Sequence, residues 1–397
     1  MKKLYLSIAF LLTFTFQVPA QLQGLDVVKV PEAQQPYSGE YIYIPDVDGY
    51  KALKCDFHVH TIFSDGDLKP ENRVWEGAIR GLDVIAITDH IEYRPNSYIK
   101  ADHNESYRRA KTIEASSKVI VIQGAEITRS KPIGHINALF LSDANALDVD
   151  DPLTAIDNAL AQGAFIMWNH PGWPNDTSTI YKVHEELIRQ KKIHGIELVN
   201  GFEYYPKAFN YCKDYGLTYM GNTDIHGVYR QTYRTDIQSG PMTVVFAKER
   251  SEEGVKEALF AGRSVVKFGD ILIGSEKNLT ALVKACLTYE VKNTHDNQAL
   301  VKVMNKSTLN FEILLDNKSV TILGNATTEF KVRLNDKAKF TNTYITDNSQ
   351  LVIDVSSLGR ACHKPLINSY TMKKILIILL AFLSPPFFMV IMGGWIH

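Results

Sequence analysis

The sequence has no excess of charge of either sign, and this absence narrows the range of partners. Its 397 residues include 43 lysines and arginines and 44 aspartates and glutamates, for a formal net charge of -1 at pH 7. A neutral chain without basic stripes has no general attraction for nucleic acid or for an acidic membrane. We therefore expect no nucleic-acid partner, and any anion that the protein binds must be recognised locally.

Cysteine is also scarce, and its spacing excludes two further classes of fold. The four cysteines, at positions 55, 212, 286 and 362, form no C-x-x-C motif. This spacing excludes a zinc ribbon and a disulfide scaffold. With 45% hydrophobic and 22% charged residues, the composition is that of a globular protein, and the length suits one large domain and one small domain.

The N-terminus has the pattern of an export signal. Two lysines follow Met1, an apolar run covers residues 4-16, and Val18-Pro19-Ala20 resembles a cleavage site before Gln21. This pattern predicts a signal peptide over residues 1-20 and a periplasmic or secreted mature protein. The alternative is an N-terminus that remains anchored in the membrane.

A second apolar segment closes the chain at residues 372-397. It is long enough to span a bilayer, but Lys373 and Lys374 precede it. The positive-inside rule would hold these lysines in the cytoplasm, on the wrong side for an exported domain. The segment also begins Met-Lys-Lys-Ile, much as the chain begins Met-Lys-Lys-Leu. A transmembrane anchor and a fused second export signal both remain open, and we expect membrane contact only if the segment is a genuine part of the protein.

The middle of the chain shows strands that alternate with helices. Residues 21-51 form a lead-in without clear periodicity, whereas residues 52-275 alternate short apolar runs with amphipathic ones. Such alternation implies parallel βα units, and seven or eight units imply a barrel. Residues 276-360 lose the helical period and show short alternating runs, which predict a small antiparallel β-sandwich-like domain.

Residues 56-66 are the most informative stretch. Because side chains alternate along a strand, His58 and His60 point to one face of a predicted strand over Cys55–His60. Two imidazoles on one strand face suit a shared metal ion. The alternative is an edge strand that carries two solvated histidines.

More acidic residues and histidines occur where other predicted strands end. These residues are Asp65, His90, Glu126, His170, Asp224 and His226, while His135 opens a strand instead. In βα barrels the active-site residues lie at the carboxyl ends of the strands. The placement therefore predicts one metal site at that end, and we interpret the remaining histidines as ordinary polar or capping residues.

These motifs resemble those of the PHP (polymerase and histidinol phosphatase) superfamily of metallophosphoesterases, over about residues 52-275. The similar motifs are D-x-H-x-H-T-x-x-S-D-G at 56-66, T-D-H at 88-90, G-x-E at 124-126, single histidines at 135 and 170, and D-x-H at 224-226. More narrowly, T-D-H-I-E-Y-R-P at 88-95, G-A-E-I-T-R-S at 124-130, W-N-H-P-G-W at 168-173 and the trailing β module are similar to those of exported Sb-PDE-type phosphodiesterases.

The resemblance implies an α/β fold, a distorted (β/α)7 TIM-like barrel that holds two or three divalent ions of zinc, manganese or iron. By motif, the first ion would be held by His58, His60, Glu126 and Asp224. Glu126 would bridge to a second ion, which is completed by His135 and His170. The third ion would be held by Asp65, His90 and His226. The catalytic residues would be Asp65, Glu126 and Asp224, and the leaving group would take its proton from a residue such as Asp65 or from water.

Substrate recognition rests on weaker signals. Two arginines are candidate ligands for substrate phosphate: Arg94, four residues after His90, and Arg129, three residues after Glu126. One guanidinium group can donate two parallel hydrogen bonds to two phosphate oxygens. Four aromatic residues are candidates for an apolar pocket wall, although core packing would explain them as well: Trp168, Trp173, Tyr204 and Tyr205. Asp56 and Glu197 are candidates for orienting the imidazoles.

The expected function is that of an exported metal-dependent phosphoesterase, with diesters preferred, that acts on a small-molecule phosphate ester. A hydroxide that bridges two metal ions would attack phosphorus. The alternatives are a phosphomonoesterase of the histidinol-phosphatase type, a nucleic-acid-processing enzyme and a non-catalytic binding module.

Overall fold

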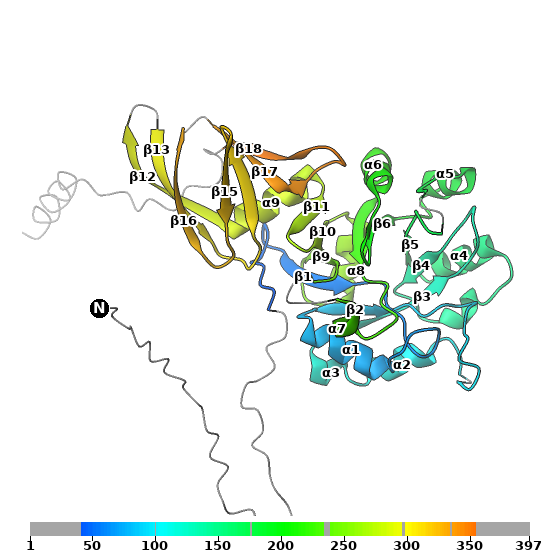
Figure 1. Cartoon of the computed structure of the whole chain (residues 1–397). Coiled ribbons are helices and arrows are strands. Elements are labelled where there is room, and N and C mark those ends of the chain that lie inside the picture. Colours follow the sequence, from blue (N-terminus) through cyan, green and yellow to red (C-terminus); the bar gives the residue numbers. More distant parts are fainter. Residues whose placement is uncertain are drawn as a thin grey trace, which may run out of the picture. The chain divides into compact units, whose positions relative to one another are not determined.

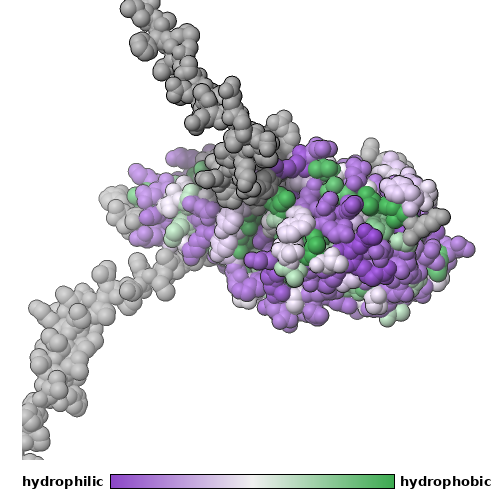
Figure 2. Space-filling view, turned by 90° about the horizontal axis from the view of Figure 1, so that it is seen from below, coloured by the Kyte–Doolittle hydropathy of each residue, from purple (hydrophilic) through white to green (hydrophobic). Residues whose placement is uncertain are grey.

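The computed structural model describes residues 41-99, 101-174, 177-233, 239-295, 298-333 and 336-354. The predicted signal peptide, most of the lead-in and the apolar tail lie outside these residues. Within the described part of the chain, no helix is both long and apolar enough to cross a membrane. Figure 2 shows hydrophilic residues over most of one face, with hydrophobic residues in separate patches among them.

A continuous sheet organises the part of the chain that carries the predicted motifs (Figure 1). Its strands in this part are β1 Lys51–Asp56, β2 Val84–Ile87, β3 Ile120–Ile127, β4 Ile136–Leu139, β5 Phe165–Trp168, β6 Gly195–Asn200, β7 Glu203–Tyr204, β8 Thr218–Asn222, β9 Met242–Ala247, β10 Ser264–Phe268 and β11 Ile271–Gly274. The spatial order runs β11-β10-β9-β1-β2-β3-β4-β5-β6, and both β7 and β8 pair with β6. Parallel pairing joins β1, β2 and β3, and it also joins β5, β6 and β8.

The expected parallel α/β sheet is therefore present, but the described strands do not form a closed barrel. No ladder of backbone hydrogen bonds links β8 to β9 among them. Instead, the Thr243 hydroxyl on β9 accepts a hydrogen bond from the Gly221 N–H of β8 and donates to the Gly221 carbonyl, each at 2.9 Å. A side chain at Gly221 would collide with Val266 of β10, so a glycine is required where these strands approach.

Two further expectations about the strands are wrong. Strand β4 runs antiparallel to both β3 and β5, because the connection over residues 128-135 is too short for the crossover that a parallel strand needs. Strand β1 ends at Asp56 rather than at His60. His58 and His60 therefore lie in the loop that leaves β1, where an isolated bridge between Val59 and Ile225 continues the pairing.

The helices begin and end at residues whose chemistry explains the boundaries. They are α1 Pro70–Ile79, α2 Glu105–Lys111, α3 Glu114–Ser117, the 3-10 helix η1 Ala144–Leu147, α4 Pro152–Ala161, α5 Lys182–Arg189, α6 Pro206–Tyr215, α7 Tyr229–Thr232, α8 Glu252–Phe260 and α9 Glu276–Cys286. Proline opens α1, α4 and α6, since it has no N–H to leave unpaired in the first turn. The Asp151 carboxylate caps α4 by accepting the Thr154 N–H at 2.8 Å, and Gly216 ends α6 with a φ of +68°.

The second part of the chain is rich in β-strands, as expected. Its strands are β12 Leu287–His295, β13 Gln298–Asn305, β14 Phe311–Leu315, β15 Lys318–Ile322, β16 Thr327–Arg333, β17 Lys337–Tyr344 and β18 Gln350–Asp354. Strands β12, β13 and β16 form a separate sheet, whereas β17 pairs in parallel with β11 and so extends the first sheet. One sheet therefore continues across residues 275/276, where the sequence predicts a domain boundary. That boundary stays a prediction.

Two histidines outside the motifs, the buried His184 and the half-buried His194, are both held as neutral rings. The His194 Nδ1 atom accepts the Ile166 N–H at 2.9 Å, and its ring lies 4.7 Å from the Phe260 ring centroid. The His184 Nδ1 atom accepts the Tyr181 N–H at 3.2 Å, and Nε2 lies 2.8 Å from the Ile133 carbonyl. Burial lowers the pKa of each imidazole to about 4.

We predict that these histidines destabilise the fold in acid, and we test His194 by replacing it with asparagine. Its folded-state pKa of about 4 lies below the ordinary value of 6.5, so between these values only the unfolded chain binds the proton. The free energy of unfolding should therefore fall as pH drops from 6.5 to 4, on the order of 1 kcal/mol per pH unit. The variant His194→Asn keeps an acceptor for the Ile166 N–H but does not titrate. Its free energy of unfolding, measured by urea denaturation at each pH, should therefore fall less steeply between pH 6.5 and pH 4 than that of the wild type. Equal slopes for the two proteins would contradict the prediction.

Candidate metal centre

Two loops that follow strands β1 and β8 are joined to each other, and each carries ligand residues. The His60 N–H donates to the Ile225 carbonyl at 3.0 Å, and the Asp224 N–H donates to the His58 carbonyl at 2.9 Å. The side chains of His58 and His60 are completely buried. The joined loops therefore bring residues from opposite ends of the motif region, 58-60 and 224-226, to one place.

The loop that carries Asp65 is folded around a carboxylate from the next strand end. Asp89 accepts hydrogen bonds from the Thr61 N–H, the Thr61 hydroxyl and the Ser64 hydroxyl, all at 2.7 Å. The chain then turns back so tightly that a Cβ at Gly66 would lie 2.6 Å from the His60 carbonyl carbon. The T-x-x-S-D-G motif thus encodes a turn, and Asp89 is the residue that fixes it.

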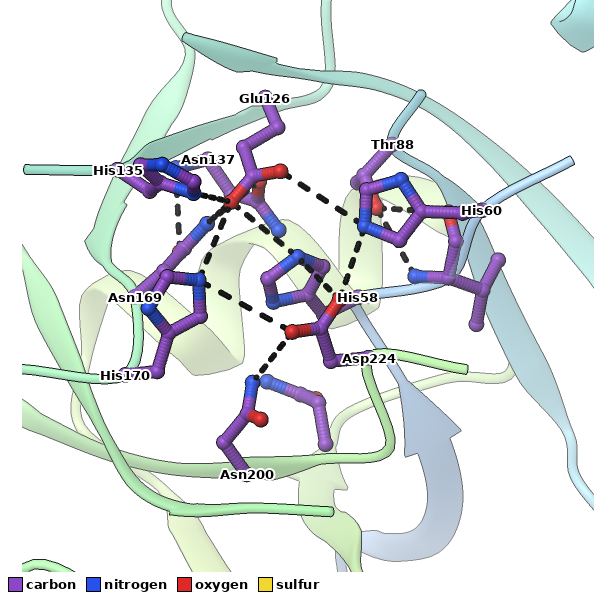
Figure 3. A network of polar contacts seen from close by, with 12 residues as sticks. His58, His60, Thr88, Glu126, His135, Asn137, Asn169, His170, Asn200 and Asp224 are labelled. Carbon is purple, nitrogen blue, oxygen red and sulfur yellow. Dashed lines mark hydrogen bonds and ion pairs between the residues drawn. The ribbon is translucent and has the colours of Figure 1, made fainter. Parts of the chain in front are cut away.

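Glu126 lies at the centre of the site (Figure 3). Its Oε1 atom is 3.1 Å from His135 Nδ1, 3.4 Å from His58 Nε2 and 3.4 Å from His170 Nε2. Its Oε2 atom is 2.6 Å from His90 Nδ1. One completely buried carboxylate therefore contacts imidazoles that arrive from four different segments of the chain.

Asp224 forms a second point of convergence beside Glu126. Its Oδ1 atom lies 2.9 Å from His60 Nε2 and 3.2 Å from His58 Nε2. Its Oδ2 atom accepts a hydrogen bond from the Asn200 side-chain amide at 3.2 Å and lies 3.9 Å from His170 Nε2. Asp224 and Glu126 therefore approach the same pair of histidines, His58 and His60, from two sides.

Asp65 marks the outer end of the group. Its Oδ1 atom lies 3.2 Å from His226 Nε2, 3.4 Å from His90 Nε2 and 3.7 Å from His60 Nδ1. All nine predicted metal ligands are thus brought together. The assignment of each ligand to one of three ions stays a prediction, because the ligand atoms overlap in four groups: His60, Asp65, His90 and His226; His58, His170 and Asp224; His58, His60 and Glu126; and His90, Glu126 and His135.

The donor atoms of this group fit a bound cation. Five of them are buried and form no hydrogen bond within the described part of the chain: His58 Nε2, His60 Nε2, Asp65 Oδ1, Glu126 Oε2 and Asp224 Oδ1. A buried polar atom without a partner is costly, and such atoms seldom occur together. Imidazole nitrogens mixed with carboxylate oxygens are a donor set for zinc, manganese or iron. The structure thus supports a metal site at these residues.

The charges of the site are strongly coupled. Burial by itself would raise the pKa of the Glu126 carboxyl, but the imidazoles of His58 and His90 outweigh it and hold this pKa well below its usual range. Burial would lower the pKa of His90, yet Glu126 and Asp65 raise it to about 10. Protonated imidazoles therefore balance the carboxylates in the metal-free protein. A divalent cation would take over this role and displace the protons.

Glu197 of β6, a predicted orienting residue, contacts both His58 and His170. Its Oε1 atom is 2.9 Å from His58 Nδ1, the ring nitrogen on the side away from Glu126. Its Oε2 atom accepts the His170 N–H at 2.8 Å and the Asn200 amide at 3.0 Å. A carboxylate in this position fixes the imidazole orientation and leaves Nε2 available to a metal.

The expectation that Asp56 also orients an imidazole is wrong. The Asp56 carboxylate contacts no histidine ring; Oδ2 accepts the Arg80 guanidinium at 2.7 Å and the Thr223 hydroxyl at 2.6 Å. Its other oxygen accepts the Thr223 N–H at 3.1 Å. Asp56 therefore positions the backbone immediately before Asp224, and the buried Arg80 balances its charge.

Two supporting residues were not predicted from the sequence. The buried Arg73 of α1 donates to the carbonyls of His60 at 3.0 Å and of His226 at 2.9 Å, so it holds two ligand loops together. The Asn169 amide donates to Glu126 Oε1 at 2.8 Å. Asn169 could have been found because it directly precedes His170, whereas Arg73 lies in a helix where an arginine normally indicates exposed surface.

A pocket of about 450 Å³ opens directly above these ligands. Its described lining comprises Asp65, His90, Tyr93, Glu126, Thr128, His135, His170, Trp173, Asn200, Glu203, Tyr205, Asp224 and His226. Among the suggested wall residues, Trp173 and Tyr205 line the pocket, whereas Trp168 and Tyr204 do not. No lysine or arginine belongs to this described lining.

The two predicted phosphate ligands are therefore not part of the lining. Arg94 donates to the Phe63 carbonyl and to the Ala101 carbonyl, both at 3.0 Å. Arg129 donates to the Val149 carbonyl at 2.6 Å and pairs with Glu92 at 2.9 Å. Both guanidinium groups hold neighbouring loops, and a role in substrate binding stays a prediction.

Comparisons with known proteins place the chain among similar proteins. The chain is similar to a two-domain protein of Bacteroides vulgatus ATCC 8482, described as containing a predicted PHP-like metal-dependent phosphoesterase, with a TM-score of 0.75 and 35% identity over 79% of this chain and 98% of that chain. Two uncharacterized proteins of Methanocaldococcus jannaschii are also similar. One is 24% identical over 187 residues, which cover 44% of this chain and 82% of that protein, and the other is 27% identical over 183 residues, which cover 45% and 67%.

The family model of the PHP domain matches residues 56-364, which include all nine ligand residues and most of the β-rich part. This match spans well over half of the chain. The protein belongs to the PHP domain family.

Proposed function

We propose that the protein is a metal-dependent phosphoesterase and that it prefers diesters. The observation that carries this proposal is the convergence of nine ligand side chains, five of them with unpaired buried donor atoms, at the base of a pocket. The similar Bacteroides protein, described as containing a predicted PHP-like metal-dependent phosphoesterase, supports the same reaction class. The proposal follows from the site and does not depend on the β-rich part.

The roles of the chain's own residues follow from their positions. Divalent ions held by these side chains would acidify a water molecule and neutralise the negative charge that develops on a phosphoryl oxygen. Glu126 and Asp224 would hold the site together, because each contacts His58 from a different side. Asp65 lines the pocket, and although burial would raise its pKa, His226 and His90 hold this pKa well below the usual range, so its carboxylate is ionised. The departing alcohol would therefore take its proton from water, and Asp65 would act as a ligand of the cation.

The preference for diesters rests on two arguments. The pocket of about 450 Å³ leaves space for an organic group beside the phosphate, and its lining includes the aromatic rings of Tyr93, Trp173 and Tyr205. The motifs at 88-95, 124-130 and 168-173 are similar to those of exported Sb-PDE-type phosphodiesterases. A monoester would use the same ligand residues but would leave the aromatic wall without an evident purpose.

We also propose that the protein is exported to the periplasm or secreted. The support is the pattern of residues 1-20, in which a basic start and an apolar run end at Ala20. The apolar segment 372-397 then has two explanations, a membrane anchor or a fused second export signal. Removing this segment from the chain separates the two by membrane fractionation, since an anchor would be needed for membrane retention.

Export predicts a defined mature N-terminus. When the full gene is expressed with its signal, the protein recovered outside the cytoplasm should begin at Gln21 in mass spectrometry of the intact chain. The variant Ala20→Lys removes the small residue at the cleavage site and should retain the longer, unprocessed form. A full-length chain that remains in the cytoplasm with Met1 intact would contradict the proposal.

Replacing the central carboxylate tests the metal site. Glu126→Gln keeps the shape but removes the charge shared among four histidines, so we predict a loss of bound metal and a fall in turnover of roughly a thousandfold. Metal content is measured by elemental analysis, and circular dichroism checks the fold. The matched control is Glu329→Gln on the exposed face of β16, which should behave as the wild type. A Glu126→Gln variant with normal metal content and turnover would refute the site.

A comparison of two chromogenic esters tests the reaction class. We predict faster hydrolysis of bis(p-nitrophenyl) phosphate than of p-nitrophenyl phosphate by protein loaded with manganese, zinc or iron. Chelator should abolish the activity, and added metal should restore it, because the ions would be held by side-chain ligands from which they can exchange. Preference for the monoester would support the phosphatase alternative instead, and activity that survives chelation would contradict metal dependence.

A further inference from the structure

The outer wall of the pocket differs in character from its base. The base consists of the predicted metal ligands, whereas the wall carries Tyr93, Trp173, Tyr205 and one further carboxylate, Glu203. Glu203 belongs to none of the groups of metal-ligating atoms found in the described residues. It is therefore a charged group in the pocket that metal binding does not explain.

Glu203 is held in place from two sides. It lies on the short strand β7, paired with Asn200 of β6, which itself lines the pocket. The phenol of Tyr205 donates a hydrogen bond to its Oε2 atom. Tyr205 is only 6% exposed, whereas Glu203 itself is exposed and thus open to a ligand. The described residues provide no ion pair for Glu203, although lysines and arginines are paired with carboxylates at many other positions.

Two aromatic rings stand beside the ligands and remain accessible. Trp173 is 49% exposed, and its ring centroid lies 4.7 Å from that of His135. Tyr93 is 53% exposed, and its ring centroid lies 5.9 Å from that of His90. Aromatic faces attract cations, and a nearby carboxylate adds a coulombic attraction of its own.

The base and the wall of the pocket would bind different parts of a phosphodiester, because their charges differ. The phosphate would be bound at the base by the metal ions, so it requires no lysine or arginine from the wall. The alcohol group would lie against the wall, where Glu203 repels a second anionic group and attracts a cationic one. A polyanion such as nucleic acid would meet this carboxylate as soon as it extended beyond the reacting phosphate.

We propose that the alcohol group of the natural substrate carries a positive charge, as an amine or a quaternary ammonium, and that Glu203, Trp173 and Tyr93 bind it. This inference rests on the proposed phosphoesterase function and specifies its substrate class. Glu203 then determines specificity and takes no part in the chemical step. Its removal should change the choice among substrates, because the turnover of a cationic ester should fall more than that of an uncharged ester.

A pair of isosteric ligands tests the charge alone. Phosphorylcholine and 3,3-dimethylbutyl phosphate have nearly the same shape, but only the first carries a positive charge. We expect the metal-loaded wild-type protein to bind phosphorylcholine about fivefold to tenfold more tightly in isothermal titration calorimetry. In Glu203→Gln the two dissociation constants should lie within about twofold of each other. Trp173→Leu should weaken phosphorylcholine binding more than that of the uncharged isostere.

The corresponding p-nitrophenyl diesters extend the test to turnover. Wild-type protein should hydrolyse the choline ester with a higher kcat/KM than the dimethylbutyl ester, and Glu203→Gln should lower the kcat/KM of the choline ester until the two values lie within about twofold of each other. Glu329→Gln serves as the control for loss of a carboxylate. Equal affinity of wild-type protein for the two isosteres, or a preference that persists in Glu203→Gln, would overturn the inference.

The proposed function and this inference fail in different ways. Absence of metal-dependent hydrolysis of bis(p-nitrophenyl) phosphate would reject the phosphoesterase, whatever the ligand affinities. Hydrolysis of that diester together with equal binding of the two isosteres would retain the phosphoesterase and reject the cationic substrate.

Discussion

The burial of Glu126 is the constraint on which the rest of the site depends. A fully buried carboxylate is costly unless positive charge surrounds it, and here imidazoles from four segments of the chain lie within 3.4 Å of its oxygens. Some of those imidazoles also lie close to Asp224 and Asp65. Replacing any one of these charged side chains would therefore leave the charge of another without compensation. A group of this kind is stable either with protons on its histidines or with metal ions between its members, and exchange between the two states couples metal binding to pH.

The sheet provides this arrangement because the loops that follow its strands carry the ligand residues and lie next to each other. The loops after β1 and β8 bond to each other through His58, His60, Asp224 and Ile225, and Thr243 joins β8 to β9 where no ladder does. Supporting groups then fix the loops rather than the ligands: Asp56 holds the Thr223 backbone, and Arg73 holds the carbonyls of His60 and His226. Among the described residues, His58 Nε2 and His60 Nε2 are thereby left without a hydrogen bond and face the carboxylates of Glu126 and Asp224, which suits a shared cation.

The sequence predicted which residues would lie together, because all of them except His135 follow short apolar runs and parallel strands bring such positions to one edge. Their roles as metal ligands stay predictions. The sequence predicted the sheet less well, since β4 pairs antiparallel through a short connection. The expected barrel is not closed among the described strands, where the Thr243 hydroxyl contacts β8 in place of a ladder. Asp56 was misassigned because strand alternation shows which face a side chain points to and not which neighbour it meets. Arg94 and Arg129 follow the motifs closely, yet nearby backbone carbonyls occupy their guanidinium groups. Proximity in sequence to a ligand is therefore weak evidence of substrate contact.

The location of bound metal tests the central claim most directly. Crystals of the protein grown with manganese or zinc would be measured on both sides of the absorption edge of the metal. The account predicts two or three anomalous peaks per chain, adjacent to the unpaired atoms of His58, His60, Asp65, Glu126 and Asp224. The peaks should be lost when Glu126 is replaced by glutamine. Crystals of active protein with no anomalous peak among these residues, or with metal bound elsewhere, would contradict the account.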